Sequence, residues 1–561
     1  MLSRTSWLGM WVMLTAVACL SCQLSVASRQ ALGAQASTLP TASPPPPDPL
    51  PSFQWQRLHT TEGLMASLTV VPPAVVTQNQ LVELRLGLRS TSVHPQTVTV
   101  QFYINRVEDT ARVMLQERAV TLEPLATQLV SASWAPAAFH GRTALLAVVT
   151  REGQRIAQPN WSLMILPPFD HAHGRKYASA PFFSGVWLEL GALGFFPPHA
   201  ITEENVRHLV RGYHARGMQI VVIAYPEFGG CFYYPSALNL HWDDYSACSF
   251  TPHTYFYQCA SPPKAMHPQL HAGDRCPFVA SFDVIGTILD EAEKHGMHVI
   301  MGLGRSGDTF FALALEDSYI AARDGVPTGI NLDLLNRRLF QITTVSKAIA
   351  DELWAKYGGY RSLYGWFLSH ETTCYDVSRN LYDPVATYVK RSTMPDRPVM
   401  VAPYAVRNCV QAAATIPTHI KDSAVDIFLY QDAVGSSTVN PAYHFDPQQR
   451  IQELGAQYEA IAQWHAGTGK HLWSSVEIWR ASPTQDQRVA PSGLWDTEVA
   501  FQLYHEGPYA QAFVLNEGLF YFDNGVAALR IPDSGKRASA EALTKNYYTY
   551  AQSYIKAMRA P

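Results

Sequence analysis

Acidic side chains stand at or just beyond the end of six apolar runs in this sequence. They are Glu189, Glu227, Glu371, Asp432, Glu477 and Glu517. Short apolar runs of this kind are typical of buried parallel strands, and in an α/β barrel the carboxyl ends of the strands surround one cleft. Two carboxyl groups in one cleft can supply a general acid and a nucleophile, which is the chemistry that breaks a glycosidic bond.

Glu371 and Glu477 are the pair that best fits this chemistry. Glu371 ends the run GWFLSHE (365–371), and Glu477 lies in LWSSVEIW (472–479). Counting the runs places Glu371 on strand four and Glu477 on strand seven, on opposite sides of a barrel mouth. A separation of about 5 Å between the two carboxyl groups predicts retention at the anomeric carbon, and about 6.5–9.5 Å predicts inversion.

Aromatic and polar residues accompany the acids. Flat rings pack well against the C–H faces of sugars, so an acidic cleft lined with rings suits a carbohydrate. The predicted substrate contacts are Trp187, Glu189, Tyr225, Glu227, Trp366, His370, Tyr430, Gln431, Asp432, Trp479 and Glu517. Each acid taken alone could instead cap a loop or pair with a rim arginine such as Arg305 or Arg480, so the prediction depends on their convergence.

From residue 178 to residue 561, strand-like and helix-like patterns alternate. Eight apolar runs predict strands at 184–190, 219–226, 298–304, 363–371, 398–404, 425–432, 471–479 and 511–517. Apolar residues at helical spacing predict helices between them, most clearly at 202–217, 282–296, 340–358 and 446–467. Eight strand–helix units predict a (β/α)8 TIM barrel as the catalytic domain, whereas a doubly wound sheet usually has about five to seven strands.

Residues 53–168 have a different pattern, with strand-like runs throughout. Alternating or β-branched segments occur at 64–71, 81–88, 97–104, 127–134, 143–150 and 161–167. Their regular spacing predicts an immunoglobulin-like β-sandwich. No catalytic constellation lies in it, so it is interpreted as an accessory domain, with carbohydrate binding as the alternative.

The first 52 residues predict export. Arg4 precedes an apolar segment from Trp7 to Leu20, which is typical of a signal peptide over residues 1–27. Cys19 and Cys22 lie in imperfect lipobox-like sequences, so a lipid anchor is an alternative to free release. Residues 28–52 form a proline-rich linker. The predicted location is periplasmic, secreted or lipid-anchored in the cell envelope, and no later apolar run predicts a transmembrane helix.

Composition narrows the class of protein further. The formal net charge of −4 gives no basic surface that would favour nucleic acid. Beyond the predicted signal peptide stand the cysteines Cys231, Cys248, Cys259, Cys276, Cys374 and Cys409. An even number in an exported chain favours disulfides, and the first four predict a stapled loop over 231–276 whose pairing stays open.

Other motifs do not predict a cofactor or a metal. The sequence from Gly302 to Gly307 matches G-x-G-x-x-G, but it follows the third of eight strands and is interpreted as a glycine-lined barrel rim. The His171-Ala172-His173 segment is interpreted as interdomain linker, and the cysteine spacing lacks the paired C-x-x-C of a zinc site.

GWFLSHE, the YQDAVG segment (430–435) and LWSSVEIW resemble a bacterial family assigned to the glycosyl hydrolases and catalogued as domain of unknown function 4434. The resemblance covers roughly residues 178–530, and the barrel is similar to the large clan of retaining (β/α)8 glycoside hydrolases. It implies Glu371 as acid/base and Glu477 as nucleophile, with Gln431 and Asp432 lining the site. The clan usually has Asn before the acid/base, where this chain has His370, which implies an altered substrate or a partly lost activity.

The sequence therefore predicts an exported, retaining glycoside hydrolase that acts on a poly- or oligosaccharide without a cofactor. The alternative is a non-catalytic glycan-binding protein of the cell envelope that uses the same cleft.

Overall fold

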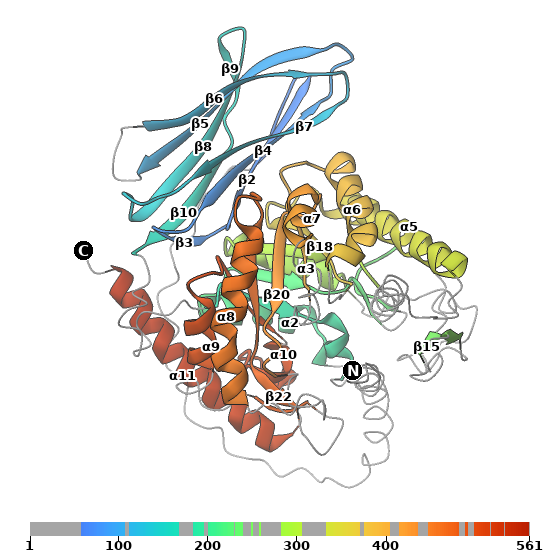
Figure 1. The fold of residues 1–561 in the computed structure, drawn as a ribbon, viewed down its shortest axis with the longest axis vertical. Coiled ribbons are helices and arrows are strands. Elements are labelled where there is room, and N and C mark those ends of the chain that lie inside the picture. Colours follow the sequence, from blue (N-terminus) through green and yellow to red (C-terminus); the bar gives the residue numbers. More distant parts are fainter. Residues whose placement is uncertain are drawn as a thin grey trace.

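The structure of this chain is a computed structural model. It describes the residues 58–106, 112–167, 183–195, 200–228, 231–238, 248–250, 257–259, 282–305, 332–370, 375–403, 415–435, 447–481, 488–491, 499–516, 518–531 and 533–559. Two sheets of mainly antiparallel strands form the N-terminal part, and a closed parallel barrel surrounded by helices follows (Figure 1).

The N-terminal part consists of two sheets with a shared core. One has the order β1 (Leu58–Thr61), β2 (Leu64–Val71), β4 (Val82–Ser90), β7 (Thr127–Trp134). The other has the order β3 (Val75–Thr77), β10 (Asn160–Leu166), β8 (Gly141–Arg151), β5 (Gln96–Arg106), β6 (Arg112–Leu122), with β9 (Gln154–Ala157) paired to β8. Alternate residues such as Leu84, Leu86, Phe102 and Ile104 are fully buried in one apolar cluster. The predicted antiparallel sheets are therefore present, and their immunoglobulin-like topology stays a prediction.

Strand β6 is the main element of these sheets that the sequence pattern did not predict. It forms the edge of its sheet, and most of its side chains are exposed. An edge strand that is largely exposed to solvent on both faces does not need the apolar alternation that identifies a half-buried strand.

Eight parallel strands close into the barrel, which confirms the predicted strand count. In order they are β11 (Gly185–Leu188), β12 (Ile220–Ile223), β17 (His298–Gly302), β18 (Leu363–Leu368), β19 (Val399–Val401), β20 (Ile427–Gln431), β21 (His471–Glu477) and β24 (Phe513–Asn516). The last strand pairs with the first through Val514 and Gly185, which closes the ring.

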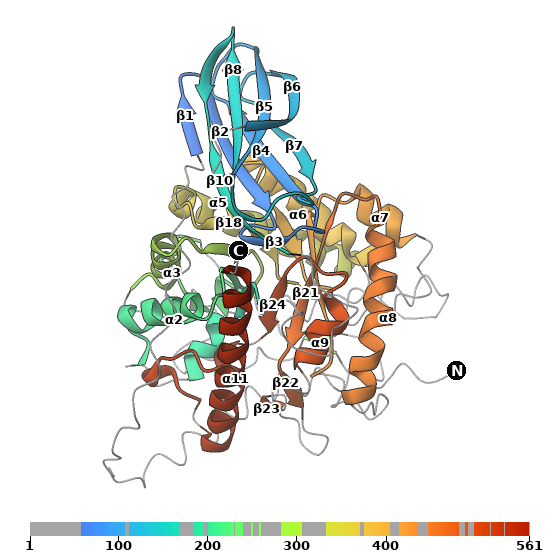
Figure 2. The same ribbon diagram turned by 90° about the vertical axis from the view of Figure 1, so that its left-hand side faces the viewer.

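Helices cover the outside of the barrel (Figure 2). They are η2 (Leu190–Phe195), α2 (Glu203–Ala215), α3 (Val284–Lys294), α5 (Leu332–Tyr357), α6 (Tyr375–Ser392), α7 (Ile416–Asp422), α8 (Pro447–His465), α9 (Val499–Glu506), α10 (Gly518–Tyr521), η8 (Ala527–Leu529) and α11 (Ser534–Arg559). Thr202 caps α2 by accepting a hydrogen bond from the Asn205 amide, and Asp283 caps α3 through the Gly286 amide.

Alternation along each barrel strand divides the apolar residues into two layers. Residues such as Val186 and Trp366 point outward and pack against the helices. Their neighbours Trp187, Phe367 and Trp473 point inward and fill the barrel. The inward residues belong to the same continuous apolar cluster as the core of the N-terminal sheets.

The N-terminal sheets close the end of the barrel at which its strands begin (Figure 2). Trp161 stacks on His298, the first residue of β17, with ring centroids 5.0 Å apart. The Tyr364 hydroxyl donates to the Val70 carbonyl across the junction at 2.8 Å. Asp396 accepts hydrogen bonds from Ser67 at 2.8 Å and Thr69 at 2.6 Å, on the outward face of β2.

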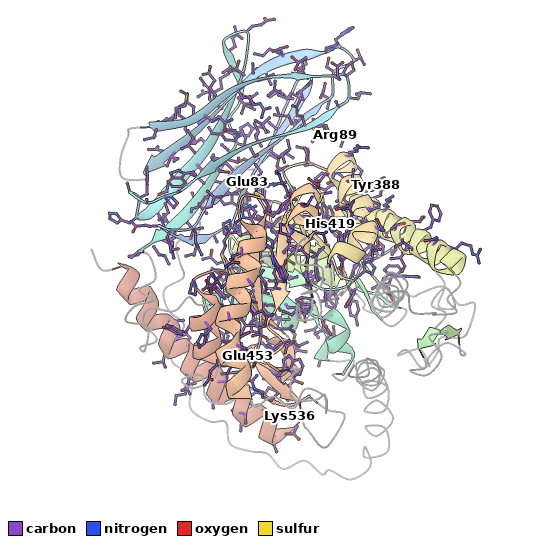
Figure 3. All side chains as sticks on the ribbon, viewed as in Figure 1. Glu83, Arg89, Tyr388, His419, Glu453 and Lys536 are labelled. Atoms are coloured by element: carbon purple, nitrogen blue, oxygen red, sulfur yellow. The ribbon has the colours of Figure 1, made fainter. Side chains whose placement is uncertain are left out.

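Buried charges cross the same junction. Arg85 on β4 pairs with Glu83 at 3.0 Å and with Asp426, just before β20, at 3.1 Å. Lys390 also pairs with Asp426 at 2.8 Å, and His471 contacts Glu83 at 3.0 Å. Figure 3 labels Glu83 where β4 meets the barrel. The polar outer face of one sheet is therefore an interface with the barrel.

Several predictions fall outside the described residues. These include the signal peptide (1–27), the linker (28–52), Cys276, Cys374 and Cys409. Within the predicted loop, β13 (Glu227–Phe228) pairs with β14 (Cys231–Phe232), and β15 (Cys248–Phe250) pairs with β16 (Tyr257–Cys259). The second register sets Cys248 opposite Cys259, and the disulfides stay a prediction. Among the described helices, none combines the length and apolarity needed to cross a membrane.

Candidate active site

The candidate site lies at the carboxyl ends of the barrel strands, opposite the N-terminal sheets. Inward-facing rows of residues change there from apolar to polar. On β21 the row runs from Trp473 through Ser475 to Glu477, and on β24 it runs from Val514 to Asn516. Glu477 and Asn516 are opposite each other in the strand register.

Glu477 is the predicted catalytic acid that lies within the described residues, and this residue is 1% exposed. The loop that follows β20 packs directly against it. A Cβ added to Gly435 would lie 3.0 Å from Glu477 Oε2 and only 2.4 Å from the Trp479 carbonyl oxygen. Glycine at 435 therefore lets this loop approach the carboxylate closely.

The residue before the other predicted catalytic acid is also buried. His370 is 2% exposed, and its carbonyl oxygen accepts a hydrogen bond from the Tyr382 hydroxyl of α6. Its ring lies against Gly304, where an added Cβ would be 3.2 Å from Nε2. Glu371 itself, which follows His370 in the sequence, lies outside the described residues, as does Glu517.

Two more predicted acids stand at neighbouring strand ends. Glu227 is fully buried, and its backbone forms an isolated parallel bridge with that of Arg305, which follows β17 and is 5% exposed. Glu189 directly follows β11, in the inward row of Trp187, and is partly buried. These acids and the arginine follow the first three strands of the barrel in the chain, and Glu477 is the last residue of the seventh.

Tyr225 and Trp479 lie near the strand ends. The Tyr225 hydroxyl donates to the Ser369 carbonyl at 3.2 Å, which ties the end of β12 to the segment after β18. Trp479 follows β21 and stacks on Tyr521, with centroids 6.3 Å apart. Trp187 lies deeper, inside the barrel, edge-on to Phe367 at 5.0 Å.

Trp366 and Tyr430 are directed away from the barrel mouth, contrary to the role predicted for them. Trp366 is fully buried between β18 and the helices, and its indole N–H donates to Thr393 at 3.4 Å. The hydroxyl of Tyr430 contacts His465 of α8 at 3.1 Å. Both side chains belong to the outward layer, which a substrate at the mouth does not reach.

Gln431 and Asp432 lie at the end of β20 but face different surroundings. Gln431 continues the inward row of Leu429, and its amide is 3.5 Å from the Ala402 carbonyl. Asp432 is fully buried and accepts a hydrogen bond from the side chain of Gln502 on α9 at 2.7 Å. The substrate contact predicted for Asp432 is therefore replaced by protein contacts.

Three polar residues of the site were not predicted. Asn516 donates to Ser475 at 3.2 Å within the inward rows, and Gln502 reaches the strand ends from α9. Asn516 and Ser475 are polar positions inside apolar runs, and this signal was available in the sequence. Gln502 carries no such signal because it lies on a helix. Among the described residues, no three histidine, cysteine, aspartate or glutamate side chains group as a metal site would require.

Comparison with known families supports the resemblance noted in the sequence. The model of a family described as "Domain of unknown function (DUF4434)" matches residues 259–498. This confirms the resemblance over a segment that contains β17 to β21, including His370 and Glu477. No curated protein matches this chain.

Solved structures that match the chain include several glycosidases. A glycosyl hydrolase family 2 member from Bacteroides cellulosilyticus DSM 14838 is 12% identical, with 86% of this chain and 49% of that one covered and a TM-score of 0.33. Beta-glucuronidase 2 of Bacteroides uniformis is 12% identical, with 88% and 50% covered and a TM-score of 0.33. The b-glucosidase EmGH1 of Erythrobacter marinus is 15% identical, with 18% and 15% covered and a TM-score of 0.16. The chain spans half or less of the length of these proteins.

Proposed function

We propose that this protein is an exported glycoside hydrolase that cleaves a poly- or oligosaccharide by a retaining mechanism, with Glu477 as nucleophile and Glu371 as acid/base. The observation that carries the proposal is the buried carboxylate of Glu477 at the carboxyl end of the seventh strand of a closed eight-stranded barrel. Catalytic groups of such barrels lie at this end of the strands.

The proposed reaction has two steps. The Glu477 carboxylate attacks the anomeric carbon while the Glu371 carboxyl group protonates the departing glycosidic oxygen, so that a glycosyl–enzyme ester forms. Glu371 then takes a proton from water, whose oxygen attacks the anomeric carbon; the bond between that carbon and the Glu477 oxygen breaks, and Glu477 leaves as a carboxylate. Burial of Glu477 suits the first step, because a carboxylate with little water around it is a stronger nucleophile toward a bound sugar.

The substrate contacts that we propose point into the barrel or lie in the segments just after the carboxyl ends of its strands. Tyr225, Glu227, His370, Gln431 and Trp479 are candidates among the described residues. Glu189 and Asn516 complete the set where β11 meets β24, and Glu517 stays a proposed contact from the sequence. Export through residues 1–27, with or without a lipid anchor at Cys19 or Cys22, and the immunoglobulin-like topology of the N-terminal sheets belong to the same proposal.

The test uses full-length protein with a panel of 4-nitrophenyl glycosides of both anomeric configurations and with bacterial polysaccharides. We expect the parent to hydrolyse at least one, and Glu371→Gln and Glu477→Gln to lower kcat/KM by about 1000-fold. Glu459→Gln, an exposed acid on α8, is the matched control and should retain the parent rate.

Azide then assigns the two roles. In Glu477→Gly, azide should attack from the vacated face and give a glycosyl azide of inverted configuration. In Glu371→Ala, azide should intercept the glycosyl–enzyme and give a glycosyl azide of retained configuration. Parent-like rates in both Gln variants would overturn the assignment, and binding of polysaccharide without any hydrolysis would favour the non-catalytic glycan-binding protein.

A further inference from the structure

The carboxylate of Asp432 contacts the backbone of Glu477. Its Oδ1 accepts a hydrogen bond from the Glu477 amide at 3.2 Å and from the Val434 amide at 3.1 Å. Its Oδ2 accepts from the side-chain amide of Gln502 at 2.7 Å. Both oxygens are thus engaged by N–H groups of the protein.

Gln502 completes the contact from the other side. The same Nε2 that donates to Asp432 also donates to the Glu477 carbonyl oxygen at 3.0 Å. Asp432 and Gln502 together therefore hold the peptide group before Glu477 and the peptide group after it. Glu477 is the residue on which the proposed chemistry depends.

This arrangement replaces a strand contact that β20 cannot supply. The Asp432 amide donates to the Ser475 carbonyl at 3.1 Å, and the chain then turns away at Ala433, which has a positive φ of 54°. A regular ladder would pair the Glu477 amide with the backbone of the neighbouring strand. The side chain of Asp432 takes over that pairing at the point where the strand ends.

Burial argues against a direct role of either side chain in binding sugar. Asp432 and Gln502 are both 0% exposed, and Asp432 follows the outward row of Tyr430 rather than the inward row of Gln431. Outward residues at this position face α9, where Gln502 lies. Their hydrogen bonds to Glu477 are to backbone atoms, which leaves its carboxylate unhindered by them.

We infer that Asp432 and Gln502 are positioning residues that fix the direction in which the Glu477 carboxylate points. The inference rests on the proposed function and assigns two further residues to it. A nucleophile held in line with the anomeric carbon reacts faster without binding its substrate more tightly, and a misplacement of about 1 Å can cost about 100-fold in rate. Loss of either residue should therefore lower kcat and leave KM largely unchanged.

The variants are Asp432→Asn and Gln502→Met. An asparagine cannot accept from all three N–H groups because one of its two side-chain atoms is a donor, and methionine fills the space of glutamine without donating. We expect kcat on the best 4-nitrophenyl glycoside of the panel to fall about 100-fold for Asp432→Asn and about 10-fold for Gln502→Met, with KM within about threefold of the parent. The rate at which a 2-deoxy-2-fluoroglycosyl fluoride of the same sugar labels Glu477 should fall by the same factors.

Matched controls separate positioning from general destabilisation. Asp383→Asn changes a carboxylate that caps the segment before β20 through the Ser423 hydroxyl at 2.9 Å and the Ala424 amide at 3.0 Å. Gln457→Met changes a glutamine on α8 whose amide has no hydrogen-bond partner in the described part of the chain. Both controls should keep the parent's kcat and labelling rate, whatever their effect on Tm.

The outcomes are distinguishable from those of the proposed function. Parent-like kcat and labelling in both single variants, while Glu477→Gln is inactive, would overturn the positioning role and leave the function intact. Activity that survives in Glu477→Gln, or a parent that cleaves none of the panel, would overturn the function and the inference with it. A crystal structure of Asp432→Asn adds a test without turnover: an unmoved Glu477 carboxylate contradicts the inference.

Discussion

The two ends of the barrel both contain buried carboxylates, but their partners differ. At the end closed by the N-terminal sheets, Asp426 and Glu83 pair with the guanidinium of Arg85. At the open end, Asp432 accepts hydrogen bonds from the neutral N–H groups of Glu477, Val434 and Gln502. Ion pairs thus join the domains at one end, and neutral donors orient an acid at the other.

Proton affinities at the closed end follow from these pairs. Burial alone would raise the pKa of Glu83, but Arg85 and His471 outweigh it and hold that pKa at about 2. The pKa of Asp426 is likewise held far below its usual value by Arg85, Lys390 and Lys470 despite complete burial. For Lys390, burial outweighs Asp426 and lowers the pKa to about 8. The acids at this end stay charged because cations lie against them, so their role is structural.

Removal of the N-terminal sheets should have the largest effect. The chain 178–561 would expose the inward core that is continuous with those sheets, and it would leave Asp426 without Arg85. We expect no cooperative unfolding transition by calorimetry and little soluble protein. A chain that begins at residue 53 keeps the sheets and is the control. A truncated barrel that melts cooperatively near the parent's Tm would contradict the idea of a shared core.

Arg85→Met should be the most damaging single change at the closed end. It leaves two buried carboxylates without their main cation, and such losses cost about 3–5 kcal/mol of unfolding free energy. Urea unfolding at pH 7 measures the loss. Arg89→Met changes an arginine of the same strand for which the described residues offer no ion pair, and it should cost less than about 1 kcal/mol (Figure 3). Equal losses in the two variants would mean that the ion pairs contribute little.

Acid should weaken the closed end through Glu83. A carboxyl group with a lowered pKa in the folded state contributes stability that is present above its unfolded pKa, about 4.5, and is lost as the pH falls toward about 2. This contribution is roughly 3 kcal/mol. We expect Glu83→Gln to flatten the fall in unfolding free energy between pH 4.5 and 2. The exposed Glu123→Gln, also on the N-terminal sheets, should leave the pH profile unchanged.

Tyr430→Phe should have the smallest effect, and it tests whether this side chain belongs to the protein core or contacts the substrate. Burial lowers the pKa of His465 to about 3, so its ring is neutral, and its Nε2 forms a hydrogen bond with the Tyr430 hydroxyl at 3.1 Å. Loss of this buried hydrogen bond should cost about 1 kcal/mol in urea unfolding. KM on the chosen glycoside should stay the same because the side chain faces the helices. A changed KM would mean that Tyr430 does contact the substrate.

The barrel was predictable because its strands are apolar on both faces. Runs such as that of β18 have no polar interruption, which identifies a buried parallel strand and its approximate end. Because both faces of each strand are apolar, the sequence does not show which residues point into the barrel. Trp366 and Phe367 are both fully buried, and only the register of the closed barrel decides that Phe367 points inward and Trp366 toward the helices.

Contacts between residues far apart in the chain could not be predicted from the sequence, for a different reason. Arg85 and Asp426 look like ordinary surface charges in the sequence, because a buried pair has no local pattern when its members lie in different domains. Gln502 lies in the same domain as Glu477, but it was missed because it contacts Glu477 from a helix after the strand, where no local pattern marks it. The position of Asp432 at a strand end could be predicted, but its contact with the Glu477 backbone could not.

The continuous core from the N-terminal sheets into the barrel also connects the two thermodynamically. If both parts unfold in one transition, any sugar that binds at the barrel mouth raises the melting temperature of the N-terminal sheets as well. Trp134 and Trp161 are buried in those sheets, at the far end of the barrel from Glu477. Their fluorescence during melting should therefore report occupancy of a site that they do not touch.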